Sequence, residues 1–108
     1  MVTPIPRVQV PSSVPKGEIF QVKALIAHQM ETGLRHDAEG SVIPRLIINR
    51  FVCRYNGVEA FIVNLHEAVA ANPYFEFYLR AVETGRLEFD WQEDGGKVYS
   101  LAHELVAS

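Results

Sequence analysis

The strongest constraint on how this chain folds is a two-residue alternation of apolar and polar side chains. Across residues 86–92, Leu87, Phe89 and Trp91 alternate strictly with polar residues, and residues 74–81 alternate in a similar way. A β-strand gathers such apolar residues on one face, whereas an α-helix scatters them around its axis. We therefore expect both segments to be β-strands with one buried face.

Two turn sequences predict hairpins. Asn56-Gly57 separates two apolar segments, and Asn-Gly is the strongest two-residue hairpin signal because both residues accept a positive φ. The turn at 93–96 contains two consecutive glycines and joins the alternating run to a last apolar segment. In that turn we expect Glu93 and Asp94 to be solvated.

Together these segments predict an all-β fold. About seven strands fit into 108 residues, which favours an immunoglobulin-like antiparallel β-sandwich, with a small closed barrel as the alternative. The chain is expected to be a single domain, 1–108, that begins with an extended, proline-spaced segment, 1–16. The other expected elements are an edge strand at 7–10, strands at 18–28, 45–55, 58–66 and 97–107, and a helical turn at His66–Pro73.

Composition excludes several classes of function. The formal charge is −3 and no basic stripe interleaves with aromatic residues, so nucleic acid is not an expected partner. No apolar run reaches the roughly 18 residues of a membrane span, and the first residues do not resemble a signal peptide. From the residues alone we expect a soluble protein whose compartment stays open.

No active site can be assembled from the sequence. Its four histidines, His28, His36, His66 and His103, lack the close spacing of zinc ligands, and no phosphate loop, carboxylate pair or serine triad is present. We therefore expect no enzyme activity, no metal and no cofactor.

Cys53 is the only cysteine, so an internal disulfide is impossible. It lies mid-strand on the more apolar face, which predicts a buried thiol because free cysteine behaves as a small hydrophobic residue. A disulfide to another chain is the alternative.

The opposite face of the same strand is a candidate subunit interface. If Cys53 points inward, Ile48 and Val52 point outward between Arg50 and Arg54. An apolar patch rimmed by charge is typical of a partner surface. An outer face partly covered by loops explains this patch equally well. The next strand, however, is apolar on both faces, which favours an obligate partner. Its apolar residues are Phe61 and Val63 on one side and Ala60 and Ile62 on the other.

The connection Gln29–Pro44 is unusually long for two neighbouring strands, and long structured loops on sandwiches commonly bind other molecules. Met30 suits an adaptable contact. The alternative is that Met30 and Leu34 plug the open end of the sandwich. The candidate docking residues in this loop are Met30, Glu31, Thr32, Arg35 and His36.

Three stretches carry a resemblance to a known family. "VKALIAHQMETGLRHDAEGSVIPRLII" (22–48), "AANPYFEFYLRA" (70–81) and the W-x-x-D-x-G pattern at 91–96 strongly resemble the SoxZ family, the smaller subunits of the SoxYZ carriers of bacterial thiosulfate oxidation. The resemblance implies an immunoglobulin-like sandwich without catalytic activity. It also implies a heterodimer with a SoxY-type subunit, which holds sulfur intermediates on a cysteine in a C-terminal Gly-Gly-Cys-Gly-Gly tail.

The resemblance further implies a compartment and a role for the long loop. SoxYZ works in the periplasm, so we expect this chain to be exported with its partner. The chain ends "LAHELVAS", without such a tail, and so resembles the subunit that does not carry sulfur. The Gln29–Pro44 loop would then contact SoxY or, transiently, the sulfur-oxidation enzymes.

Two other classes of function compete with this interpretation. A stand-alone sandwich would bind a small sulfur oxyanion with Arg35, His36 and Arg45. A redox or metal enzyme would use Cys53 together with His28, His66 or His103. Neither has support from residue spacing.

Overall fold

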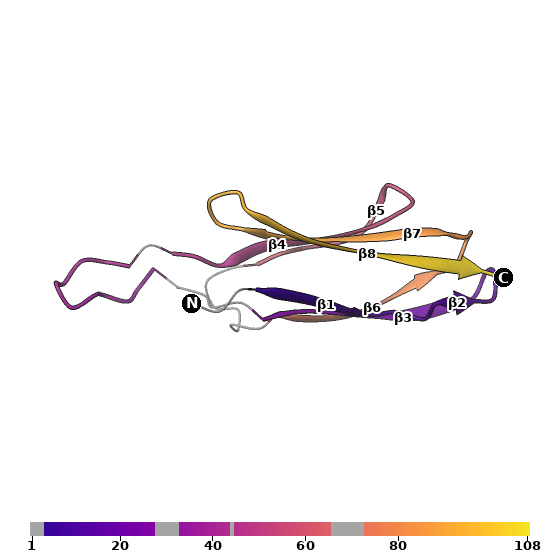
Figure 1. The fold of residues 1–108 in the computed structure, drawn as a ribbon, viewed down its shortest axis with the longest axis horizontal. Helices are drawn as coiled ribbons and strands as arrows, with labels where there is room; N and C mark the ends of the chain where they lie inside the picture. The colour runs from indigo at the N-terminus through magenta and orange to yellow at the C-terminus, as the bar shows by residue number, and fades with distance from the viewer. Residues whose placement is uncertain (1–3, 28–32, 44, 66–72) are drawn as a thin grey trace.

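The computed structural model describes residues 4–27, 33–43, 45–65 and 73–108, and they form two stacked β-sheets (Figure 1). One sheet has three strands in the order β1-β3-β6, and the other has five in the order β2-β8-β7-β4-β5. Every pairing is antiparallel except that of β2 with β8. The strands are β1 Ile5–Gln9, β2 Ser13–Val14, β3 Ile19–Ala27, β4 Ile48–Tyr55, β5 Val58–Asn64, β6 Tyr74–Arg80, β7 Gly85–Glu93 and β8 Val98–Ala107.

This architecture confirms the predicted all-β sandwich. Seven strands lie where the apolar segments predicted them, and only the two-residue β2 was missed. The expected helical turn, His66–Pro73, lies outside the described residues except for Pro73. In the described part of the chain, no helix is long and apolar enough to cross a membrane.

Both hairpin predictions are confirmed. Asn56 and Gly57 have φ values of 50° and 82°, as the turn between β4 and β5 requires. In the turn between β7 and β8, Gly95 and Gly96 have φ values of 91° and 95°, a region that glycine enters without steric cost.

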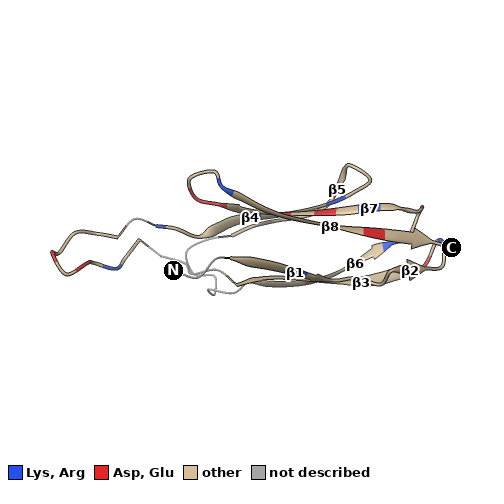
Figure 2. Cartoon of the chain, in the orientation of Figure 1, with Lys and Arg blue, Asp and Glu red and all other residues tan. Residues whose placement is uncertain are grey.

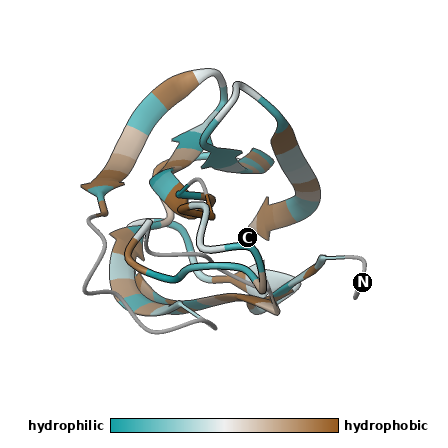
Figure 3. Ribbon diagram, turned by 90° about the vertical axis from the view of Figure 1, so that its left-hand side faces the viewer, coloured by the Kyte–Doolittle hydropathy of each residue, from teal (hydrophilic) through white to brown (hydrophobic). Residues whose placement is uncertain are grey.

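Aromatic rings from both sheets form the core. Phe51 of β4 stacks on Phe75 of β6 with ring centroids 4.7 Å apart and lies 5.1 Å from Trp91 of β7. Phe61 of β5 stacks on Phe77 of β6 at 4.0 Å. The end view shows hydrophobic and hydrophilic residues alternating in bands along the strands, so each sheet turns its apolar face inward (Figure 3).

Candidate functional site

The described part of the long loop is an arm, residues 33–43, that projects beyond one end of the sandwich (Figure 1). It is a loose hairpin closed by backbone hydrogen bonds. The Ile43 N–H donates to the Arg35 carbonyl at 2.8 Å, the Asp37 N–H donates to the Ser41 carbonyl at 2.9 Å, and His36 bridges to Val42. The projection lengthens the molecule, which measures 59 × 21 × 19 Å.

Asp37 shapes the tip of the arm. Its carboxylate accepts the N–H groups of Glu39 at 2.9 Å and Ser41 at 3.0 Å, while its carbonyl accepts the Gly40 N–H at 3.1 Å. Gly40 has a φ of 84°, which side chains with a Cβ rarely adopt. The short polar side chain and the glycine therefore reverse the chain without support from the sandwich.

The arm exposes its side chains, including apolar ones. Residues 34–42 are all exposed, with Leu34 at 81% and Val42 at 56%. Leu34 therefore does not plug the end of the sandwich, as one interpretation of the sequence had it. Of the candidate docking residues, Arg35 and His36 lie on the arm, and Met30, Glu31 and Thr32 lie outside the described residues. Charged residues of both signs are present along the arm (Figure 2).

A carboxylate anchors the root of the arm. Asp94, in the turn between β7 and β8, accepts two hydrogen bonds from the Arg45 guanidinium, both at 2.8 Å. It also accepts the Asn49 side-chain amide at 2.9 Å and the Ile47 N–H at 3.2 Å. The expectation that Asp94 is a solvated turn residue is therefore wrong, and Arg45 is engaged here and not on the arm with Arg35 and His36.

The environment of Asp94 favours its charged form. Burial raises the pKa of Asp94, but the hydrogen bonds from Arg45, Asn49 and Ile47, with the charge of Arg45, outweigh burial and lower this pKa below its ordinary value. The sequence did not predict these partners of Asp94, because they lie more than 40 positions away along the chain. Asp94 was singled out only as a turn residue and as part of the family resemblance.

The expected subunit interface on β4 needs correction. Ile48 has no exposed surface and belongs to the core, because an irregularity between Ile48 and Arg50 shifts the pairing with β7. A β-bulge adds one residue to a strand and thereby moves the residues beyond it to the other face. Val52 does lie on the outer face, between the inward-facing Phe51 and Cys53, but it is only 2% exposed. The expected exposed apolar patch is therefore absent at these positions.

The outer face of the five-stranded sheet instead carries two charge pairs at the arginine positions. Arg54 of β4 pairs with Asp90 of β7, which also accepts the Ser100 hydroxyl of β8 at 2.7 Å. Arg50 pairs more loosely with Glu59 of β5 at 3.7 Å. Arg50 and Arg54 thus face outward as predicted, but their charges are matched within the chain. Their role in a subunit interface stays a prediction.

Cys53 is buried, as its position on the strand predicts. It has no exposed surface and belongs to the core cluster. Burial raises the pKa of the Cys53 thiol to about 12, and the nearby charge of Arg54 offsets only part of this effect. A disulfide from Cys53 to another chain would therefore require the core to open.

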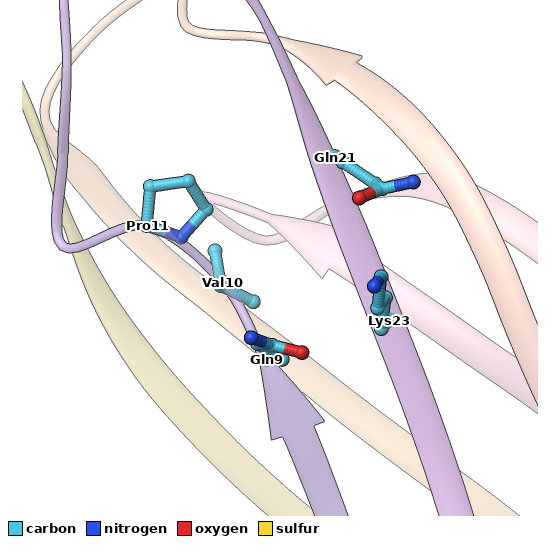
Figure 4. Close-up of a pocket in the computed structure, with 5 residues that line it drawn as sticks. All are labelled: Gln9, Val10, Pro11, Gln21 and Lys23. Carbon is cyan, nitrogen blue, oxygen red and sulfur yellow. The ribbon is translucent and has the colours of Figure 1, made fainter.

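The outer face of the three-stranded sheet was not singled out from the sequence. Gln9, Gln21 and Lys23 line a shallow hollow there together with Val10 and Pro11 (Figure 4). On β6, Tyr74 and Tyr78 are 51% and 62% exposed. Both tyrosines share the alternating positions of Glu76 and Arg80 in the run 74–81, so that run carried a signal for this face that the prediction did not use.

Two of the residues proposed for metal or redox chemistry are described, Cys53 and His103, and they lie on strands that β7 separates. His103 lies on β8, where a ring nitrogen is 3.3 Å from the Pro11 carbonyl, while Cys53 lies in the core opposite Phe89. His28 and His66 lie outside the described residues. Over 4–27, 33–43, 45–65 and 73–108, no three His, Cys, Asp or Glu residues are grouped so that they could hold a metal ion.

The solved structures of similar fold include three of one enzyme. Two structures of a superoxide reductase (neelaredoxin) from Ignicoccus hospitalis match with a TM-score of 0.74 and 18% identity, covering 95% of this chain and 79% of theirs. A third matches with a TM-score of 0.66 and 16% identity, covering 95% of this chain and 80% of that one. At such low identity the likeness shows the shared fold alone.

Comparisons of sequence give one informative match. No curated protein matches the chain significantly. A family model described as "Sulphur oxidation protein SoxZ" matches residues 8–103 and so spans all the described strands from within β1 into β8.

Proposed function

Because the chain belongs to the SoxZ family of sulphur oxidation proteins, we propose that it is the non-catalytic subunit of a sulfur-carrier heterodimer in the periplasm. Its partner is a SoxY-type subunit, which holds sulfur intermediates on a C-terminal cysteine. The two subunits are exported as a pair. This chain helps to present the bound intermediates to the enzymes of sulfur oxidation.

The burial of Cys53 is the observation that supports assigning the sulfur-bearing cysteine to the partner subunit. A sulfur carrier needs an accessible thiolate, since the thiolate is the form that bonds to sulfur intermediates. Cys53 has no exposed surface and its pKa is raised to about 12, so it offers neither access nor a thiolate at neutral pH. The sulfur-bearing cysteine is therefore assigned to the partner.

The arm, residues 33–43, is the part of this chain that we assign to docking. It stands clear of the sandwich and exposes Leu34 and Val42 among charged residues. Such a mixed surface suits a modest, reversible contact, as a carrier that serves several enzymes in turn requires.

The experiment combines purification with an activity assay. The chain carries a tag and is purified from its host, and its partner is identified by mass spectrometry. The same is done with Leu34→Ser/Val42→Ser, and thiosulfate-dependent oxygen consumption is measured in the corresponding strains. The matched control is Val58→Ser/Val98→Ser, because these valines are also exposed, at 69% and 46%, but lie on strands β5 and β8.

We expect a one-to-one partner whose C-terminal tail contains the carrier cysteine. The arm variant should lower oxygen consumption at least about tenfold, equivalent to about 1.4 kcal/mol of docking free energy, while the control variant retains it. A chain recovered without any partner would refute the carrier function. Equal activity of both variants would refute the docking role of the arm but would leave the carrier function standing.

A further inference from the structure

The four edges of the two sheets differ in how they are protected from pairing with other strands. A free edge offers unpaired N–H and C=O groups, and proteins commonly protect it with proline, a bulge or a very short strand. Strand β2 has only two residues and covers β8 at Val106 and Ala107 alone, so no described strand pairs with the rest of β8 on that side. In β5, a shift between Cys53 and Arg54 leaves one extra residue in the strand, which marks a bulge.

Strand β1 is protected by Pro6. The hydrogen bond from the Ile26 N–H to the Pro73 carbonyl, 3.4 Å, shows that Ile26 bonds toward β6 and not toward β1. Because Pro6 lies opposite Ile26, the backbone nitrogen of Pro6 is on the free edge of β1, where it has no hydrogen to donate.

Strand β6 has none of these devices. It has seven residues without proline, and it pairs with β3 without a register shift. No other described strand lies on its second side.

The hydrogen bonds at both ends of β6 show which of its residues face that free edge. Pro73 accepts from β3, and the Ala81 N–H donates to the Glu18 carbonyl at 2.9 Å. Because bonding alternates along an antiparallel strand, the odd-numbered residues of β6 bond to β3. The even-numbered ones, Tyr74, Glu76, Tyr78 and Arg80, direct their N–H and C=O groups away from it.

We propose that this edge of β6 pairs antiparallel with β6 of a second copy of the chain, centred on Phe77. This register uses the N–H and C=O groups of the four outward residues, except that the Arg80 carbonyl already accepts the Val82 N–H at 3.0 Å. It places Tyr74 opposite Arg80 and Glu76 opposite Tyr78, each pair occurring twice. The first pair sets a guanidinium beside an aromatic ring, and the second sets a carboxylate beside a phenol hydroxyl.

Side chains on both sides of β6 support a second copy as the occupant. On the outer face, no like charges stand directly opposite each other in this register. On the inner face, Phe75 of one copy lies opposite Leu79 of the other, and both are only partly buried in the single chain. The two sheets would join into a continuous sheet of six strands across a two-fold axis.

The test uses the isolated full chain, so it is independent of any carrier partner. Sedimentation equilibrium over micromolar to submillimolar concentrations should show a reversible dimer. Glu76→Pro removes an outward N–H that β3 does not use, and so should raise the dimer dissociation constant about thirtyfold for the two hydrogen bonds lost. Glu76→Thr is the matched control, because it removes the same carboxylate but keeps the N–H, and it should change the constant far less.

A second variant keeps the proposal testable if the proline variant does not fold. Tyr78→Glu, at a residue 62% exposed, sets two carboxylates directly opposite each other twice and should also weaken the dimer. A monomer at all concentrations would overturn the proposal, as would a dimer that neither variant weakens. If the isolated chain is monomeric and Glu76→Pro instead prevents recovery of the carrier partner, the edge belongs to that partner and not to a second copy.

Discussion

The sandwich is stabilised mainly by contacts between side chains, whereas the arm is stabilised mainly by hydrogen bonds of its backbone. In the sandwich the side chains meet, and Phe51 alone contacts five other aromatic rings. In the arm, hydrogen bonds of the backbone and of the Asp37 carboxylate hold the turn, while residues 34–42 are exposed. Side chains exposed to this degree are available for recognition, which is why we place the docking function on the arm.

The largest expected effect is in the sandwich. Phe51→Ala should lower the free energy of unfolding by about 3–5 kcal/mol, because it removes the central ring and leaves a cavity that its neighbours fill only in part. Urea denaturation followed by tryptophan fluorescence measures this change. Phe51→Leu is the control and should cost much less, since it keeps most of the volume. A loss below about 1 kcal/mol for the alanine variant would contradict the central role of Phe51.

The reactivity of Cys53 tests the same core without a substitution. With a pKa of about 12, its thiolate fraction at neutral pH is about a thousandth of that of an exposed cysteine, and the core also blocks access. We expect a thiol reagent to label the folded chain at least that much more slowly than the chain unfolded in urea. Rapid labelling of the native protein would show that the core opens readily, and would revive a disulfide to another chain.

A smaller effect is expected at the junction of the two regions. Asp94→Asn should cost about 1–3 kcal/mol, because the Arg45 guanidinium loses its ionic partner. The pKa of Asp94 is lowered in the folded state, so this stabilisation is fully present above the ordinary aspartate pKa and is lost as the pH falls through the lower folded value.

Urea denaturation of the wild type and of Asp94→Asn, repeated at several acidic pH values, measures this contribution. The difference between the two proteins should shrink as the pH falls. Glu59→Gln breaks the looser and more exposed pair with Arg50, and should change stability by less than about 0.5 kcal/mol. Equal costs for the two variants would show that Asp94 is no special anchor.

The smallest effect on stability is expected in the arm. Leu34→Ser/Val42→Ser should change the free energy of unfolding by less than about 0.5 kcal/mol, because both side chains are mostly exposed in the single chain. Thermal unfolding followed by circular dichroism measures it. A loss above about 2 kcal/mol would mean that the arm packs on the sandwich, and would remove the contrast from which its function is argued.

Local sequence rules predicted the strands well, because burial in a two-layer sandwich requires alternation along each strand. The run 86–92 and the Asn56-Gly57 turn were readable for this reason. The sequence did not predict which face of the sheet Ile48 occupies. A β-bulge is a local backbone irregularity, and the alternation of side chains does not reveal it. Alternation predicts which face of the sheet a side chain lies on but not how exposed that side chain is. It therefore predicted that Val52 points outward and did not predict that Val52 is buried.

The candidate sites were less predictable than the fold. The length of the 29–44 connection indicated a special role, but it did not show that residues 33–43 project as an arm with a turn held by Asp37. The partnership of Asp94 with Arg45 joins residues 49 positions apart, and a single sequence does not show such pairs. The free edge of β6 became visible only once the order of the strands was known.

The bidentate hydrogen bonds between Arg45 and Asp94 restrict how the chain moves at the base of the arm. One hydrogen bond would act as a swivel, whereas two parallel ones to a planar guanidinium set an angle as well as a position. The pair therefore links Arg45, close after the arm in the sequence, to the turn between β7 and β8 of the five-stranded sheet. A protein that bound the tip of the arm would therefore be held in a defined orientation relative to the sandwich.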